Sequence, residues 1–239
     1  MDRQGYFIFN GEDSRTYGLW LTGSGVYGAP ARKFDSIAIP GRNGTLTMDG
    51  GAFEDIDHTY GECFIASEDA AESLEALRNA LMSVVGKVRL TDSYHEDEFY
   101  LARYMRGLEP KMAPLAASAK FDLTFSRDPR RFLTAGEAVT AFTASGSITN
   151  PTRFKAYPLL RIYGTGNVGV GSQTITINYA DGYTDFDCEN MDAYKGAVDC
   201  NEYVELSTND YITLAPGANG ITLGAGITRA EVTPRWYIL

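Results

Sequence analysis

Residues 164–169 have the spacing of the glycine-rich fingerprint that binds dinucleotides, with glycine at positions 164, 166 and 169. In that fingerprint the pyrophosphate is bound at the N-terminus of the helix that follows. Residues 170–177 alternate apolar and polar side chains instead, which is typical of a strand. We therefore interpret the motif as a glycine-rich turn between strands and expect no nucleotide cofactor.

The histidines do not complete a zinc site. The run His95–Phe99 begins like the helix motif of zinc proteases, but Phe99 stands where the second histidine ligand is required. His58 and Cys63 are five residues apart, so on a strand they would face opposite sides of the sheet. We therefore predict no zinc site.

Three alternating acids, Asp185, Asp187 and Glu189, would share one face of a strand. We expect this row to be solvated, and calcium binding is the alternative because calcium prefers oxygen ligands. The sequence has no Gly-x-Ser-x-Gly motif, and no histidine follows His95, so its second half cannot form a serine or cysteine triad of its own. Paired carboxylates of the glycosidase type occur in any acidic chain. We predict that the protein is not an enzyme and has no catalytic, metal or cofactor site.

The overall composition limits the partners. A formal net charge of −10 argues against stable binding of nucleic acid, which is driven by lysine and arginine. An odd number of cysteines, Cys63, Cys188 and Cys200, indicates reduced thiols and a reducing compartment. The apolar run Tyr6–Phe9 is short and followed by acidic residues, so we expect neither a signal peptide nor insertion into a membrane.

The elements that must position any site are mostly strands, because glycine, tyrosine and threonine are abundant. Residues 36–49 read as a β-hairpin, with Ile37 and Ile39 before the reversal Pro40–Gly44 and Leu46 and Met48 after it. A helix is predicted over Ser67–Val85, with Ser67 as its cap and a leucine stripe that packs on a sheet.

The second half reads as short alternating strands separated by turn residues, which is typical of an antiparallel sandwich. Before it, residues 134–152 are mostly alanine, threonine, serine and glycine and end in Asn150-Pro151. We interpret them as a linker between a domain of residues 1–133 and a domain of residues 153–239.

Several short motifs, in this order and spacing, make the chain resemble the distal tail proteins of long-tailed, non-contractile bacteriophages. In the first half these are Phe9-Asn10-Gly11, Ile39–Leu46, the predicted helix, Leu90–Tyr94 and Arg127–Phe132. In the second half they are Tyr157–Gly164, Phe186–Glu189, Leu214–Ile221 and Pro234-Arg235-Trp236. The resemblance covers nearly the whole chain.

This resemblance implies a mainly β protein, with an N-terminal domain like that of tail-tube proteins, containing one helix, and a galectin-like antiparallel β-sandwich. It implies a virion protein of the tail tip, assembled in the cytoplasm of the bacterial host. Such proteins form a homohexameric ring that joins the tail tube to the tail-tip hub and, in many phages, to receptor-binding proteins. A carbohydrate-binding, lectin-like module is the alternative function.

We predict that the hairpin is the interface of this ring, because a lone two-stranded ribbon with an apolar face is marginal in water unless that face is covered. The alternative is that it packs on its own domain's helix or sheet. The predicted interface residues are Ile37, Ile39, Arg42, Asn43, Leu46 and Met48.

Overall fold

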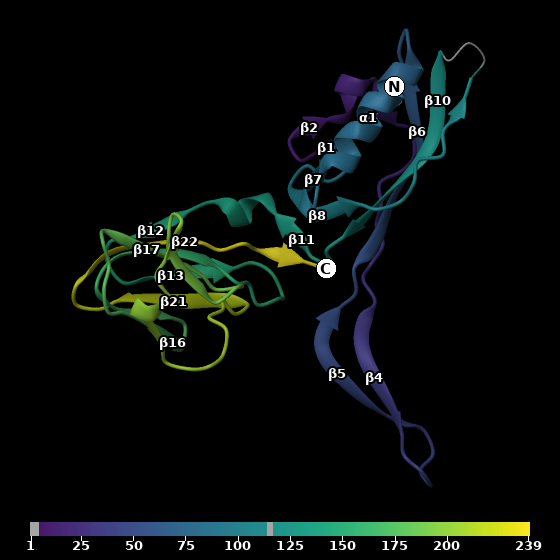
Figure 1. The fold of residues 1–239 in the computed structure, drawn as a ribbon. Coiled ribbons are helices and arrows are strands. Elements are labelled where there is room, and N and C mark those ends of the chain that lie inside the picture. Colours follow the sequence, from purple (N-terminus) through teal and green to yellow (C-terminus); the bar gives the residue numbers. More distant parts are fainter. Residues whose placement is uncertain (1–4, 114–116) are drawn as a thin grey trace. The chain divides into compact units, whose positions relative to one another are not determined.

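The computed structural model describes residues 5–113 and 117–239. They form two compact units, of which the first ends at Arg131 and the second spans Phe132–Ile238 (Figure 1). Strands account for most of the regular structure, and a single α-helix occurs in the described part of the chain. The predicted mainly β fold is confirmed.

The first unit is built on an antiparallel sheet whose strands lie in the order β2-β1-β7-β8-β10-β6-β3. The strands are β1 (Phe7–Phe9), β2 (Glu12–Asp13), β3 (Leu19–Leu21), β6 (Ile56–Ala66), β7 (Val88–Asp92), β8 (Glu98–Tyr104) and β10 (Ser118–Arg127), with the short β9 (Lys111–Met112) paired to β10. A 3-10 helix, η1 (Ser14–Tyr17), precedes β3. Side chains alternate along β10, so that Phe121, Leu123, Phe125 and also Arg127 point to the buried face.

The helix α1 (Ala70–Ser83) packs against this sheet (Figure 1). Its buried residues Leu74, Leu77 and Leu81 recur at intervals of three and four, as the predicted stripe requires. The cap is Asp69 rather than Ser67, because its carboxylate accepts hydrogen bonds from the backbone N–H groups of the first turn.

The strands β4 (Arg32–Ala38) and β5 (Thr45–Phe53) form a separate two-stranded sheet, which is the predicted hairpin (Figure 1). It is longer than predicted. The prediction ended the hairpin at Asp49, yet β5 continues through Gly50 and Gly51 to Phe53, with Gly51 at φ +72°. The pairing register shifts between Arg32 and Phe34, and this irregularity accommodates the extra length.

The second unit is a sandwich of two antiparallel sheets, β12-β22-β14-β17-β18-β19 and β13-β21-β15-β16-β20. Their strands are β12 (Thr140–Phe142), β13 (Gly146–Asn150), β14 (Leu159–Gly164), β15 (Gly166–Val170), β16 (Gln173–Ile177), β17 (Tyr183–Asp187), β18 (Asp192–Lys195), β19 (Val198–Asp199), β20 (Val204–Leu206), β21 (Gly217–Leu223) and β22 (Ile227–Thr233). The remaining elements are β11 (Arg131–Leu133), η3 (Thr134–Glu137), η4 (Asn201–Tyr203) and β23 (Tyr237–Ile238). Inward-facing residues of both sheets, including Ile162, Val168, Ile175 and Val232, form one core.

Residues 134–152, predicted to be a linker, instead form η3, β12 and β13 of the second unit. Each strand lies at the end of the strand order of its sheet. Asn150 is buried, and its side-chain amide donates hydrogen bonds to the carbonyls of Phe154 (2.8 Å) and Leu214 (3.0 Å). Small side chains suit an edge strand, which has few neighbours to pack against, so composition alone did not distinguish this segment from a linker.

Candidate functional site

The six predicted interface residues lie together on the hairpin. Ile37 is directly opposite Leu46, and Asp35 is opposite Met48, so these four residues share one face of the ribbon. Ile39, Arg42 and Asn43 lie in the loop between β4 and β5, where the N–H of Arg42 donates to the carbonyl of Ile39 (3.1 Å).

The apolar side chains of this face are exposed. The exposed fractions are 45% for Ile37, 43% for Leu46 and 56% for Met48. The alternative interpretation requires the hairpin to pack on the helix or the sheet of its own unit, and these exposed fractions argue against it. Exposed apolar side chains gathered on one face are typical of a surface that a second molecule covers. We call Ile37, Leu46 and Met48 the aliphatic face of the hairpin.

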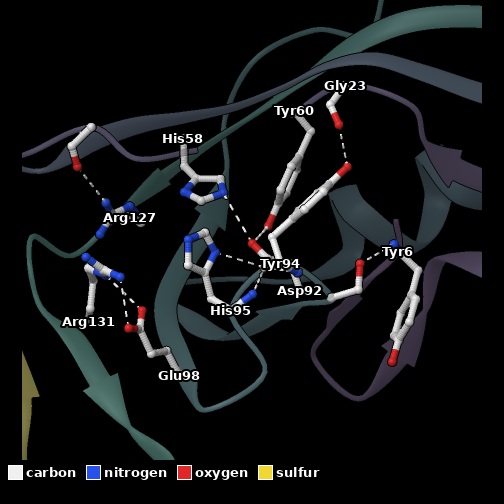
Figure 2. Close-up of polar contacts among 12 residues, drawn as sticks. Tyr6, Gly23, His58, Tyr60, Asp92, Tyr94, His95, Glu98, Arg127 and Arg131 are labelled. Atoms are coloured by element: carbon white, nitrogen blue, oxygen red, sulfur yellow. Dashed lines mark hydrogen bonds and ion pairs between the residues drawn. The ribbon is translucent and has the colours of Figure 1, made fainter. Parts of the chain in front are cut away.

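A buried polar cluster centred on Asp92 lies at the end of β7 (Figure 2). The Oδ2 atom of Asp92 accepts a hydrogen bond from the hydroxyl of Tyr60 (2.8 Å). Its Oδ1 atom accepts from the backbone N–H groups of Tyr94 and His95 (both 2.9 Å) and lies 3.1 Å from Nδ1 of His95. These contacts fix the turn that follows β7.

His58 is completely buried beside this carboxylate, with Nε2 3.8 Å from Oδ2 of Asp92. Neither ring nitrogen has a hydrogen-bond partner among the described residues. Burial, together with the nearby positive charge of Arg127, lowers the pKa of His58 to about 3, although Asp92 acts in the opposite direction. His58 is therefore neutral at physiological pH. Because the cluster is closed to solvent and Asp92 is committed to several donors, it has the character of a structural centre and not of a catalytic one.

Sequence reasoning assigned no role to Tyr60, Asp92 or Arg127. Asp92 has a local signature, since a carboxylate that accepts from the N–H groups two and three residues later forms an Asx turn, and Asp92-Ser93-Tyr94 fits that pattern. The contact with Tyr60 joins residues 32 positions apart and leaves no such signal.

The glycine-rich motif is predicted to be a turn, but most of it is strand: Gly164 ends β14, only Thr165 lies between the strands, and residues 166–169 belong to β15. β16 follows with no intervening helix in this fully described stretch. Gly164 has φ +98°, and a Cβ atom there would lie 2.2 Å from the carbonyl oxygen of Gly226. These glycines are required for the close approach of two backbones.

Of the other candidate ligands, the two histidines both lie beside Asp92. His95 lies in the turn before β8 and not on a helix. Asp185 forms an ion pair with Arg161 (2.7 Å) and Asp187 with Arg235 (2.8 Å). Both carboxylates lie on the largely buried strand β17, so the prediction that they are solvated is wrong. Among the residues that the structure describes, no group of three histidine, cysteine or acidic residues could hold a metal ion. No helix in the described ranges is long and apolar enough to span a membrane.

Comparison with known proteins gives matches by structure only. No protein-family model and no curated protein matches the sequence. The solved structure of SPP1 Dit (gp 19.1), described as a paradigm of the hub adsorption apparatus in phages that infect Gram-positive bacteria, aligns with a TM-score of 0.74 and 14% identity. The match covers 98% of this chain and 99% of that chain. A chain of the phage P2 baseplate in its activated, calcium-containing conformation aligns with a TM-score of 0.53 and 9% identity over 96% of both chains. The predicted mainly β fold with a β-sandwich is thus confirmed over 98% of the chain.

Proposed function

We propose that this chain is a structural component of a phage tail tip, where it forms a homohexameric ring between the tail tube and the tail-tip hub. The observation that supports this function best is the likeness to SPP1 Dit over nearly the full length of both chains. A match of this extent includes both units and their order, whereas shared use of one common domain would cover only part of each chain.

The hairpin supplies the proposed contact between subunits. Its aliphatic face is exposed in the single chain, and a two-stranded ribbon is marginally stable in water unless a further surface covers it. We propose that the face packs against the neighbouring subunit of the ring. The proposed outward partners are the tail tube protein, the hub or another tail-associated protein, and a receptor-binding protein, with assembly in the host cytoplasm.

Replacing Ile37 and Leu46 together by aspartate tests this interface, because they are directly opposed on the aliphatic face. Burial of two unpaired charges costs several kcal/mol, which is enough to prevent subunit contact. The matched control is Ser36→Asp with Thr47→Asp, an equally opposed pair on the other face of the same ribbon.

The Ile37→Asp/Leu46→Asp variant should retain its circular dichroism spectrum but fail to form rings by mass photometry. It should also fail to complement tail assembly in a phage that lacks the wild-type gene. The control pair should form rings and tails. Rings or tails formed by the first variant at the wild-type level would place the interface elsewhere, and its unfolding would assign the hairpin to the core of the monomer.

A carbohydrate-binding role is the second candidate, and a groove on the sandwich favours it. Tyr157 and Tyr211 line this groove with their rings edge to face and the centroids 5.7 Å apart. Tyr211 is 53% exposed, so it is available for stacking on a sugar. A glycan array probed with the wild-type chain and with Tyr211→Ala tests this role. Signals that Tyr211→Ala abolishes would support it, and an array without signal would exclude it for the glycans present.

A further inference from the structure

The outgoing leg of the hairpin, residues 22–31, joins β3 to β4 without forming a helix or a strand. Three side chains hold it against the first unit, and Figure 2 shows the contact of one of them, Tyr94, with Gly23. The hydroxyl of Tyr94 donates to the carbonyl of Gly23 (2.6 Å), and Nη2 of Arg127 donates to the carbonyl of Gly28 (3.3 Å). The ring of Tyr27 meets His95 edge to face, with the ring centroids 5.1 Å apart.

Tyr94 and His95 are held in place by the buried polar cluster, and Arg127 by its position in β10. Tyr94 and His95 belong to the turn whose backbone N–H groups bind Asp92. Arg127 ends β10 and is only 1% exposed, with its guanidinium carbon 4.7 Å from the centre of the Tyr100 ring. The contacts to the leg therefore come from positions that the core already fixes.

Arg127 has no carboxylate partner among the described residues. Its guanidinium hydrogen bonds go to the backbone carbonyls of Gly28 and Asp128 (3.4 Å), and its Nε has no partner in the described part of the chain. A buried cation without a counter-charge is costly, and a hydrophobic residue would suit this core position better. Holding the carbonyl of Gly28 is a structural reason for an arginine here.

The return leg of the hairpin, residues 54–55, is also attached close to the ends of β4 and β5. The N–H of Glu54 donates to the carbonyl of Ala31 (2.9 Å), which ties the two legs together beyond the ends of β4 and β5. Nζ of Lys87 lies 2.7 Å from Oδ1 of Asp55. Both legs are thus attached to the body of the unit close to where the ribbon begins.

We infer that Tyr94, His95 and Arg127 form a clamp on residues 22–31 that sets the direction in which the hairpin leaves the first unit. Because the core fixes the clamp residues, their contacts with the leg also fix the orientation of the exposed ribbon. This inference concerns the single chain and holds whether or not the chain forms a ring.

The test measures the direction of the hairpin in the isolated protein by electron paramagnetic resonance distances. Nitroxide labels are placed at Thr47→Cys in β5 and Glu75→Cys in α1, both exposed sites, after Cys200→Ser removes the half-buried native thiol. Tyr94→Phe deletes one hydroxyl from the clamp, and Arg127→Met removes the guanidinium. The matched control is Tyr104→Phe, because the hydroxyl of Tyr104 is buried without a hydrogen-bond partner among the described residues.

We expect the distance distribution to broaden in Tyr94→Phe and further in Tyr94→Phe/Arg127→Met, and to stay at the wild-type width in Tyr104→Phe. Hydrogen exchange in residues 22–31 should rise about fivefold in Tyr94→Phe, which corresponds to loss of a typical hydrogen bond. An unchanged distribution in folded Tyr94→Phe would overturn the clamp, as would equal broadening in Tyr104→Phe. If Arg127→Met does not fold, the distance distribution of Tyr94→Phe alone tests the clamp.

Discussion

Replacing His58 by phenylalanine should make the first unit less sensitive to acid. His58 is neutral and fully buried in the folded chain, beside Arg127, Asp92 and His95 and in ring contact with Tyr60 and Tyr100. Phenylalanine keeps the ring contacts and removes two nitrogen atoms that have no hydrogen-bond partner among the described residues.

The size of the effect follows from the pKa of His58, which is 6.5 in a solvated chain and about 3 in the folded protein. Between these values the unfolded chain binds more protons than the folded one, so the free energy of unfolding falls as the pH falls below 6.5. The loss levels off once the pH is below about 3. At about 1.36 kcal/mol for each pKa unit, the loss is about 2 kcal/mol between pH 8 and pH 5 and about 4 kcal/mol between pH 8 and pH 3.

Urea unfolding at pH 8, 6 and 5 measures this loss in the first unit. The sequence has two tryptophans, Trp20 in the first unit and Trp236 in the second, so a Trp236→Phe background leaves fluorescence that reports on the first unit alone. In this background the chain should lose about 2 kcal/mol from pH 8 to pH 5, and the His58→Phe variant should lose almost none.

The reasoning fails if both chains lose the same amount of stability between pH 8 and pH 5. Carboxylates cannot account for a shared loss in this range through their ordinary titration, because they protonate mainly at lower pH. His58→Asn serves as a second neutral replacement in case the larger phenylalanine ring does not fit. Agreement between the two variants would assign the acid response to the charge of His58.

Two further predictions concern the second unit. Gly136→Ala should lower its free energy of unfolding by about 3 kcal/mol, because the added Cβ would lie 2.3 Å from the backbone nitrogen of Trp236. Gly220→Ala, where nothing lies within 4 Å of the added atom, should change it by about 0.5 kcal/mol or less, and equal effects in urea unfolding would refute this steric argument. Asp187→Asn should cost about 1–3 kcal/mol at pH 7, since burial of Asp187 opposes its charge but the hydrogen bonds from Arg235 outweigh burial and lower its pKa. The contribution of Asp187 is present above pH 4 and is lost as the pH falls through its lowered pKa, so the difference between variant and wild type should shrink as the pH falls, and a constant difference would contradict the ion pair.

The hairpin and the helix could be predicted because their signals are local. Alternation on both sides of the Asn43-Gly44 step specifies the ribbon, and leucines at intervals of three and four specify the helix. The exact length of the hairpin could not be predicted. Gly50 and Gly51 favour a turn by their intrinsic properties, and only the pairing with the opposite strand shows that β5 continues through them.

The buried polar cluster could not be predicted because its members are far apart in the sequence and only the folding of the sheet brings them together. Tyr60 and Asp92 come from strands that are not neighbours in the strand order, and Arg127 lies at the end of a third strand. No spacing in the sequence encodes such a meeting. Likewise, the small residues before Asn150 fit an edge strand as well as a linker, and the pairing of β13 with β21 decides between them.

The exposed hairpin also gives the isolated chain a surface that could aggregate. A ribbon with aliphatic side chains and two unpaired edges is a template for edge-to-edge aggregation. Charged residues are interspersed along it: Lys33, Asp35 and Asp49 are all exposed, and Asp49 is paired with Arg32 (2.9 Å). Asp35 lies on the same face as Ile37, Leu46 and Met48, and such charges oppose edge-to-edge stacking of like ribbons, as gatekeeper residues do beside aggregation-prone strands. The charged side chains along the ribbon thus act against self-association of the isolated chain through its exposed strands.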